Sequence, residues 1–244
     1  MTASVRAMAD PSIVPVHHHR DLRGGAARAA VFGIQDGLVT NVGLILGVAG
    51  ADPGRGFVRL AGLAGLIAGA VSMAAGEFNS MQVQRELMER ELDLERQALD
   101  TMPHVETVEL AQIYQSKGME AAQAREMAEQ MMRDPERALE VHALEELGIS
   151  PNALGSPLAA SSSSFVAFSV GALVPLLPWF VGGGAAAIAC SLVLATIAAV
   201  AVGYAIARTT TRRAPIAIVR QLGYTLIPAV LTFLIGKAVG VNVG

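Results

Sequence analysis

The sequence is poor in cysteine and in charged residues. Cys190 is the single cysteine among 244 residues, which excludes an intramolecular disulfide and a cysteine-based zinc site. Charged residues make up 16% of the chain, whereas soluble domains carry roughly a quarter. Aspartate and glutamate are absent after Glu146. This distribution is not that of a soluble protein with an evenly charged surface.

Apolar residues are abundant instead, at 52% of the chain. Residues 30–50 carry a single charge, Asp36, and a helix needs about 20 apolar residues to cross a bilayer core. Residues 57–76 are rich in glycine and alanine, whose small size lets helices pack closely in lipid. Three further apolar runs follow the acidic part of the chain. We predict five transmembrane helices, at residues 30–50, 57–76, 158–180, 181–207 and 221–241.

Basic residues beside the spans predict the orientation, because arginine and lysine are enriched in cytosolic loops. More of them lie on the N-terminal side of the predicted bundle than on the opposite side: Arg20, Arg23, Arg28, Arg208, Arg212, Arg213 and Arg220 against Arg55, Arg59 and Lys237. We therefore expect a cytosolic N-terminus and an external C-terminus. No apolar segment precedes Ala29, so a cleavable signal peptide is not expected.

The acidic residues are concentrated in one insert. Residues 77–147 contain 17 acidic and 7 basic residues. Residues 77–101 lack glycine and proline and are rich in strong helix formers, so the second span is expected to continue out of the membrane as one long helix. We predict an all-α membrane protein with a three-helix cytosolic domain inserted between the second and third spans. Its expected parts are a disordered cytosolic tail (1–28), transmembrane helices 1 and 2 (29–76), an acidic helical metal-binding domain (77–150) and transmembrane helices 3 to 5 (157–244).

Side chains of the types that bind metal ions occur in the first span and where the second span joins this insert. Asp36 lies within the first span, where an ionisable residue usually marks an ion or proton pathway. Met73, Glu77 and Met81 recur every fourth residue and so share one stripe of a helix. A thioether with carboxylates suits Fe(II) or Mn(II) better than Ca(II) or Mg(II). The alternatives are an Asp36 paired with arginine at the interface, and methionines that only pack between helices.

The insert offers carboxylates in pairs at helical spacing. Pairs of this kind on three helices, with one imidazole among them, predict a carboxylate-rich metal site. The alternative is that most of these acids lie on solvated faces, and glutamate–arginine pairs support that alternative for the first helix. The pairs are Glu91 with Glu95, Glu106 with Glu109, and His142 with Glu146, with Glu145 beside the last.

Several blocks, in the same order and spacing, resemble the vacuolar iron transporter family. They are DGLVTNVGLILGVAGA, GAVSMAAGEFNSMQVQREL, Pro103 followed by ETVELAQIYQSKGM, and ALEELGI, and the resemblance runs from about Phe32 to the C-terminus. It implies a homodimer with five spans per subunit that exchanges cytosolic Fe(II), often also Mn(II), for protons. It also implies that a three-helix cytosolic domain collects the metal.

The resemblance extends to individual residues. It implies that Asp36 and Met73 line the translocation path and that Glu77 lies at its cytosolic mouth. In the metal-collecting domain this chain departs from the family pattern, because Ala98 replaces a second acid of the long helix and His142–Ala143 replaces a methionine pair. The metal ligands expected there are Glu95, Glu106, Glu109, His142 and Glu146, with Glu91 or Glu145 as compensating ligands.

The expected function is proton-coupled export of Fe(II) and Mn(II) from the cytosol, with Zn(II) and Co(II) as further candidate ions. No prosthetic group, nucleic-acid partner or enzymatic activity is expected. A di-iron oxidase would need Glu-x-x-His pairs, but Thr101 and Leu139 stand three residues before His104 and His142.

A membrane-anchored metal sensor or scaffold, which would bind metal without moving it, is the alternative function. The expected location is a prokaryotic plasma (inner) membrane, or a vacuolar-type membrane in a eukaryote.

Overall fold

Helices form every regular element in the part of the chain that the structure describes. This computed structural model describes residues 25–151, 154–210 and 213–240. The expected N-terminal tail up to residue 24 and Arg212 lie outside the described residues. The predicted all-α class is confirmed, and five of the helices are long and apolar enough to span a membrane, as many as the predicted spans. They are α1 (Gly25–Gly50), α2 (Arg55–Thr101), α6 (Pro157–Leu176), α8 (Gly184–Thr210) and α9 (Ala214–Gly240).

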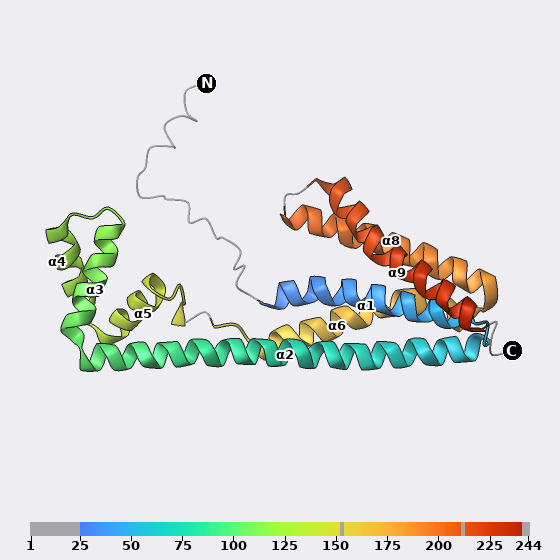
Figure 1. Ribbon diagram of the computed structural model, residues 1–244, viewed down its shortest axis with the longest axis horizontal. Helices are drawn as coiled ribbons and strands as arrows, with labels where there is room; N and C mark the ends of the chain where they lie inside the picture. The colour runs from blue at the N-terminus through green and yellow to red at the C-terminus, as the bar shows by residue number, and fades with distance from the viewer. Residues whose placement is uncertain (1–24, 152–153, 211–212, 241–244) are drawn as a thin grey trace, which may run out of the picture.

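Helix α1 lies at the centre of the apolar bundle. It packs against α2, α6, α8 and α9, and Figure 1 shows it between α6 and the α8–α9 pair. Its approach to α6 is close because Gly37 and Gly171 lack side chains: a Cβ at either would overlap a backbone carbonyl oxygen of the other helix. Packing of small residues drives helix association in lipid, where no hydrophobic force acts between helices. The core at α1 contains Leu38, Val42, Leu46, Ala195, Ala199 and Ala229.

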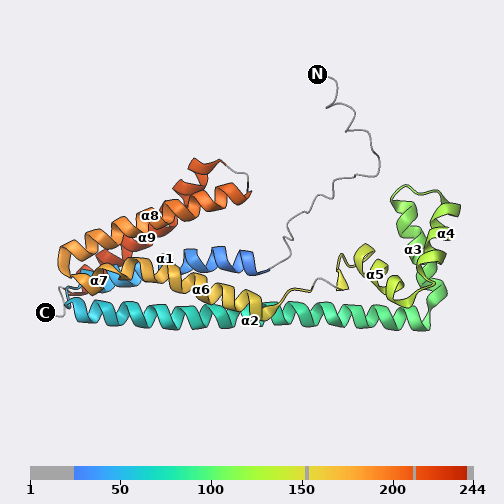
Figure 2. The same ribbon diagram turned by 180° about the vertical axis from the view of Figure 1, so that it is seen from behind.

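Helix α2 is continuous over 47 residues. At 1.5 Å per residue it is about 70 Å long, more than twice the thickness of a bilayer's hydrocarbon core. Figures 1 and 2 show its first part beside α1 and α6 and its second part extending well beyond them. Residues 77–101 contain no glycine or proline that would interrupt the helix. The helix therefore connects the apolar bundle rigidly to the polar insert.

Three shorter helices follow at the far end of α2: α3 (Pro103–Ser116), α4 (Ala121–Met131) and α5 (Pro135–Glu145). We call these helices, together with residues 77–101 of α2, the helical cap. Gly118 and Gly148 follow α3 and α5 with φ of 97° and 66°, a conformation that glycine adopts without steric cost. The side chain of Asp134 caps α5 by accepting hydrogen bonds from the amides of Glu136 and Arg137. Helix α5 packs back against α2, which brings the end of the insert beside its beginning.

Several spans differ from the predicted ranges: α1 begins at Gly25 rather than at residue 30, and α8 covers Gly184–Thr210 rather than 181–207. The third was expected to reach residue 180, but α6 ends at Leu176 and Pro178 begins the short helix α7 (Pro178–Val181). Proline lacks an amide hydrogen, so the helical hydrogen-bond ladder is interrupted there. The fifth was expected to begin at residue 221, but α9 begins at Ala214. The apolar run itself begins earlier than expected, because residues 214–219 are apolar and only Arg220 and Gln221 interrupt it.

Candidate metal sites

A groove with metal-binding side chains lies between α1 and α2. Its volume is about 340 Å³. Helix α1 contributes one side chain per turn and α2 contributes two adjacent stripes, as expected for residues spaced by three and four. The lining residues are Phe32, Asp36 and Thr40 of α1, Gly69, Ser72, Met73, Gly76 and Glu77 of α2, and Phe168 of α6.

The structure brings Asp36, Met73 and Glu77 to this one groove. Asp36 is half-buried, and the hydroxyl of Thr40 donates a hydrogen bond to its Oδ1 at 3.3 Å. Met73 is half-buried and also packs against the cluster formed by Ala70, Phe168 and Ala172. Two carboxylates and a thioether are therefore available to a divalent ion in the groove, with Met73 held in place by its apolar neighbours.

Met81, the third member of the predicted stripe, lies outside the groove. It is 6% exposed and packs with Ala29 and Ala160. Its burial among alanines agrees with a packing role. Of the three residues in the predicted stripe, Met73 and Glu77 therefore line the groove and Met81 does not.

An ion pair lies at the end of the groove nearest the cap. Nη2 of Arg28 donates a hydrogen bond to Oε1 of Glu77 at 2.7 Å. Sequence reasoning considered an arginine partner for Asp36, whereas the structure pairs Arg28 with Glu77. Spacing along α1 could not distinguish the two, because the choice depends on how α2 lies against α1.

Sequence reasoning also missed polar residues on α1. Thr40 is one turn after Asp36, and this spacing was a usable signal for a groove residue. Asn41 is fully buried and donates from Nδ2 to the carbonyl of Ala172 at 2.6 Å. Its Oδ1 is buried without a hydrogen-bond partner, which is costly away from water. Nothing in the sequence around Asn41 indicated that its side chain points into the bundle.

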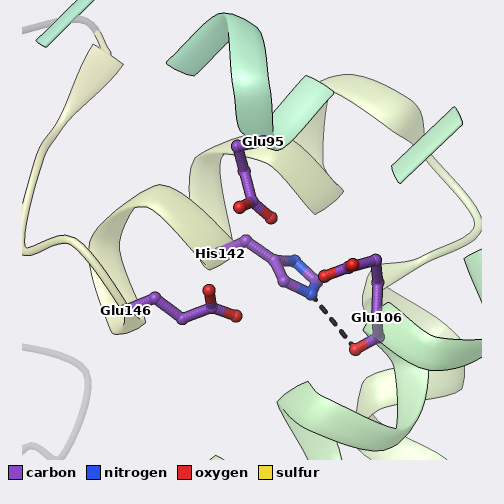
Figure 3. A group of neighbouring side chains, drawn as sticks. All are labelled: Glu95, Glu106, His142 and Glu146. Carbon is purple, nitrogen blue, oxygen red and sulfur yellow. Dashed lines mark hydrogen bonds between the residues drawn. The ribbon is translucent and has the colours of Figure 1, made fainter. Parts of the chain in front are cut away.

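A second group of ligand side chains lies in the helical cap. Glu95 comes from α2, Glu106 from α3, and His142 and Glu146 from α5 and the residue after it. One ligand atom from each of these residues lies within 4.8 Å of the others. Figure 3 shows the three carboxylates around the imidazole. Side chains from the end of α2, from α3 and from the end of the insert therefore converge on one volume.

Both ring nitrogens of His142 contact backbone carbonyl oxygens. The residue is fully buried, with Nδ1 2.9 Å from the carbonyl oxygen of Ala138 and Nε2 3.3 Å from that of Glu106 (Figure 3). In a neutral imidazole one nitrogen donates and the other carries a lone pair. A proton on Nδ1, which makes the shorter contact, leaves on Nε2 a lone pair that faces the carbonyl oxygen of Glu106, so a metal ion at Nε2 would have to replace that contact. A backbone acceptor on the other ring nitrogen is the usual arrangement for a histidine that binds metal.

The carboxylates of this group are held close together without enough positive charge. Burial raises the pKa of Glu95. The carboxylates of Glu106 and Glu109 raise this pKa further, and His142 lowers it. Oε1 of Glu95 is buried without a hydrogen-bond partner. Burial and the neighbouring carboxylates raise the pKa of Glu146 to about 7, although the residue as a whole is exposed. A divalent cation would relieve this repulsion and satisfy the unpaired oxygen.

The other acids named as possible ligands lie outside this group. Glu109 is exposed, yet near enough to raise the pKa of Glu95 and Glu146. Glu145 forms an ion pair with Lys117. Glu91 is exposed on α2, and the structure does not bring it to the four ligand atoms. Three carboxylates and one imidazole thus make up the group, which is sufficient to bind a transition metal ion.

Residues 27–237 match the sequence profile of the VIT family. The vacuolar iron transporter of Acanthamoeba castellanii is 37% identical over 161 residues, which are 65% of this chain and 58% of that protein. Vacuolar iron transporter 2 of Oryza sativa subsp. japonica is 32% identical over 78% of each chain. Vacuolar iron transporter 1 of Arabidopsis thaliana is 27% identical over 77% of each chain.

Proposed function

This chain belongs to the VIT family, and from that premise we propose that it moves Fe(II), and also Mn(II), out of the cytosol in exchange for protons. Relatives named vacuolar iron transporters support iron as the cargo. One observation carries the mechanism: helix α2 bears residues of both ligand groups, with Met73 and Glu77 in the groove and Glu95 in the cap.

The ligand chemistry supports the choice of cargo. Carboxylates alone favour Mg(II) and Ca(II), while thioether and imidazole ligands favour softer transition metals. The groove adds a thioether to two carboxylates, and the cap adds an imidazole to three. This mixture suits Fe(II) and Mn(II), and Zn(II) and Co(II) are further ions that it would bind.

Transport begins, in this proposal, with capture of the ion by Glu95, Glu106, His142 and Glu146. The ion then passes Glu77 at the mouth of the groove and reaches Asp36 and Met73. Asp36 alternates between metal-bound and protonated forms, so that metal leaving in one direction is matched by protons moving in the other. An acid within a span serves this purpose because only its charged form attracts the cation.

We propose that the cap and the N-terminus face the cytosol of a plasma or vacuolar-type membrane, and that domains divide at residues 28, 76 and 150. The basic residues flanking the spans support this orientation. We further propose a homodimer. Exposed apolar side chains of α2, including Phe57, Leu60 and Ile67, are consistent with spans in contact with lipid or with a second subunit.

Flux in proteoliposomes tests the proposed function. The purified chain should carry Fe(II) and Mn(II) across the bilayer, faster with an opposing proton gradient than without one. An internal pH indicator should report protons moving opposite to the metal. Metal flux that is indifferent to a proton gradient would contradict antiport, and absence of flux in the wild-type protein would contradict transport.

A metal sensor or scaffold is the second candidate function. The cap group favours it because all four of its ligands come from one chain and need no pathway through the membrane. A sensor would bind metal at the cap and show no flux. It would leave the groove ligands Asp36 and Met73 without a role, which makes transport the better account.

A further inference from the structure

Arg28 continues the row of groove residues on α1. Phe32, Asp36 and Thr40 line the groove at intervals of four residues, and Arg28 lies one turn before Phe32 on the same stripe. Gly69, Met73 and Glu77 form the facing row on α2 with the same interval. The two rows end together at the contact between Arg28 and Glu77, so this contact closes the end of the groove nearest the cap.

The two partners of this contact differ in exposure. The side chain of Glu77 is 11% exposed, while that of Arg28 is 69% exposed. A carboxylate this well covered needs a cation or several hydrogen bonds, because burial disfavours its charge. The arginine, in contrast, loses little solvation when it leaves, since most of its side chain is already in contact with solvent.

The pair is also unlike the other ion pairs of α2. Arg85 pairs with Glu89 within the same helix, with both side chains about half exposed at 44% and 45%. Arg28 reaches instead from α1 to α2, and a single hydrogen bond between Nη2 and Oε1 joins the two residues. A single bond across two helices, rather than a bidentate one, is a contact that a competing cation displaces more readily.

We propose that Arg28 is a displaceable counter-ion for Glu77, so that metal enters the groove by exchange. This inference rests on the proposed transport function. The incoming divalent ion takes the place of the guanidinium at Glu77, and Arg28 returns once the ion has moved on to Asp36. The carboxylate of Glu77 then always has a positive partner. Metal entry requires the Arg28–Glu77 ion pair to break, which weakens the apparent affinity for the metal. Arg28 acts through Glu77 and is a positioning residue rather than a metal ligand.

The test is the concentration dependence of Fe(II) and Mn(II) flux in proteoliposomes of the full chain. Arg28→Gln removes the competing charge and should lower KM about two- to fivefold, the range expected for loss of a partly exposed ion pair, with kcat little changed. Arg28→Lys keeps the charge and should remain near the wild-type KM. Arg85→Gln, which breaks the comparable surface pair on α2, is the matched control and should leave KM unchanged.

A double variant separates exchange at Glu77 from general repulsion of cations by Arg28. In a Glu77→Gln background Arg28→Gln should no longer lower KM, because the carboxylate for which the two cations compete is gone. A KM that is unchanged or raised in Arg28→Gln, or lowered equally in the Glu77→Gln background, overturns the inference and leaves transport standing. Absence of flux in the wild-type protein overturns the proposed function and this inference with it.

Discussion

The groove and the cap each combine carboxylates with one softer side chain, but they arrange them differently. The groove lies between two neighbouring helices, and its candidate metal ligands are Asp36, Met73 and Glu77. One of them, Glu77, is already paired with an arginine. The cap group gathers four ligands from three helices around a fully buried imidazole. The cap is therefore suited to hold an ion, and the groove to hold one briefly and release it.

The difference follows from how each site compensates its negative charge. In the cap, burial raises the pKa values of Glu95 and Glu146, and the neighbouring carboxylates raise them further. A divalent ion would supply positive charge there, and we predict that it binds tightly. In the groove, Arg28 supplies positive charge before any metal arrives. A site that binds and releases in each cycle gains from a competitor, because binding that is too strong slows release.

Loss of Asp36 should have the largest effect, and this effect should be confined to the groove. Asp36→Asn removes the intramembrane charge, and flux should fall by more than the 10- to 100-fold that substitutions around metal ligands typically cost. Metal binding by the cap should be unchanged. Asp52→Asn is a matched control, since Asp52 lies in the loop between α1 and α2 with φ of 54°, which asparagine tolerates. Flux close to wild type in Asp36→Asn would contradict the proposed path.

Loss of a cap ligand should have the converse effect. Glu95→Gln keeps the shape of the side chain but not its charge, and metal affinity of the cap should fall about 10- to 100-fold in calorimetric titration. Flux at saturating metal should persist, because the groove is intact. The control is Glu89→Gln on the same helix, whose carboxylate pairs with Arg85. Equal weakening by Glu91→Gln would show that Glu91 is a ligand as well.

Acid pH should weaken the cap more than a solvent-exposed carboxylate site. The pKa of Glu146 is raised to about 7, so below pH 7 a metal ion must displace a proton from it. Affinity should fall at least about tenfold from pH 7.5 to 5.5, and Glu146→Gln should flatten this dependence. Titrations at several pH values measure it. A profile that Glu146→Gln leaves unaltered would assign the proton to another group.

The smallest expected effect concerns stability without metal. Glu146 binds its proton more tightly in the folded protein than in the unfolded chain, because its folded pKa is raised from 4.5 to about 7. Its contribution to stability is therefore present at acid pH and is lost as the pH rises through 7. As the pH rises from 4.5 to about 7, the melting temperature of the metal-free protein should fall by at most a few degrees. Added metal should reverse the decrease, and Glu146→Gln should abolish it in thermal scans.

Much of the fold could be predicted from the sequence because it depends on neighbours along the chain. Apolar length identified five spans, and the lack of glycine and proline in residues 77–101 indicated that α2 continues out of the bundle. The boundaries were less predictable. Pro178 interrupts the third apolar run inside a stretch that hydropathy alone treats as continuous, and α9 begins seven residues before its predicted start.

The candidate sites were predictable to the extent that helical spacing defines them. Met73 and Glu77 share a stripe in any α-helix, and the structure places both in the groove. Spacing on single helices could not select among the acids of the insert. Glu106 is buried in the ligand group, whereas Glu109 on the same helix is exposed. Glu145 and Glu146 are adjacent, yet the first pairs with Lys117 and the second joins the group.

The sequence by itself determined that this chain is a helical membrane protein with an acidic insert, and that candidate metal ligands lie in a row where the two meet. Periodicity and apolar length are properties of a single helix, so they can be recognised in the sequence without a structure. Only the tertiary structure decided that Glu95, Glu106, His142 and Glu146 converge, and that Arg28 faces Glu77 rather than Asp36. Those contacts depend on the turns between helices and on the packing of α1 against α2, which residues distant in the chain determine together.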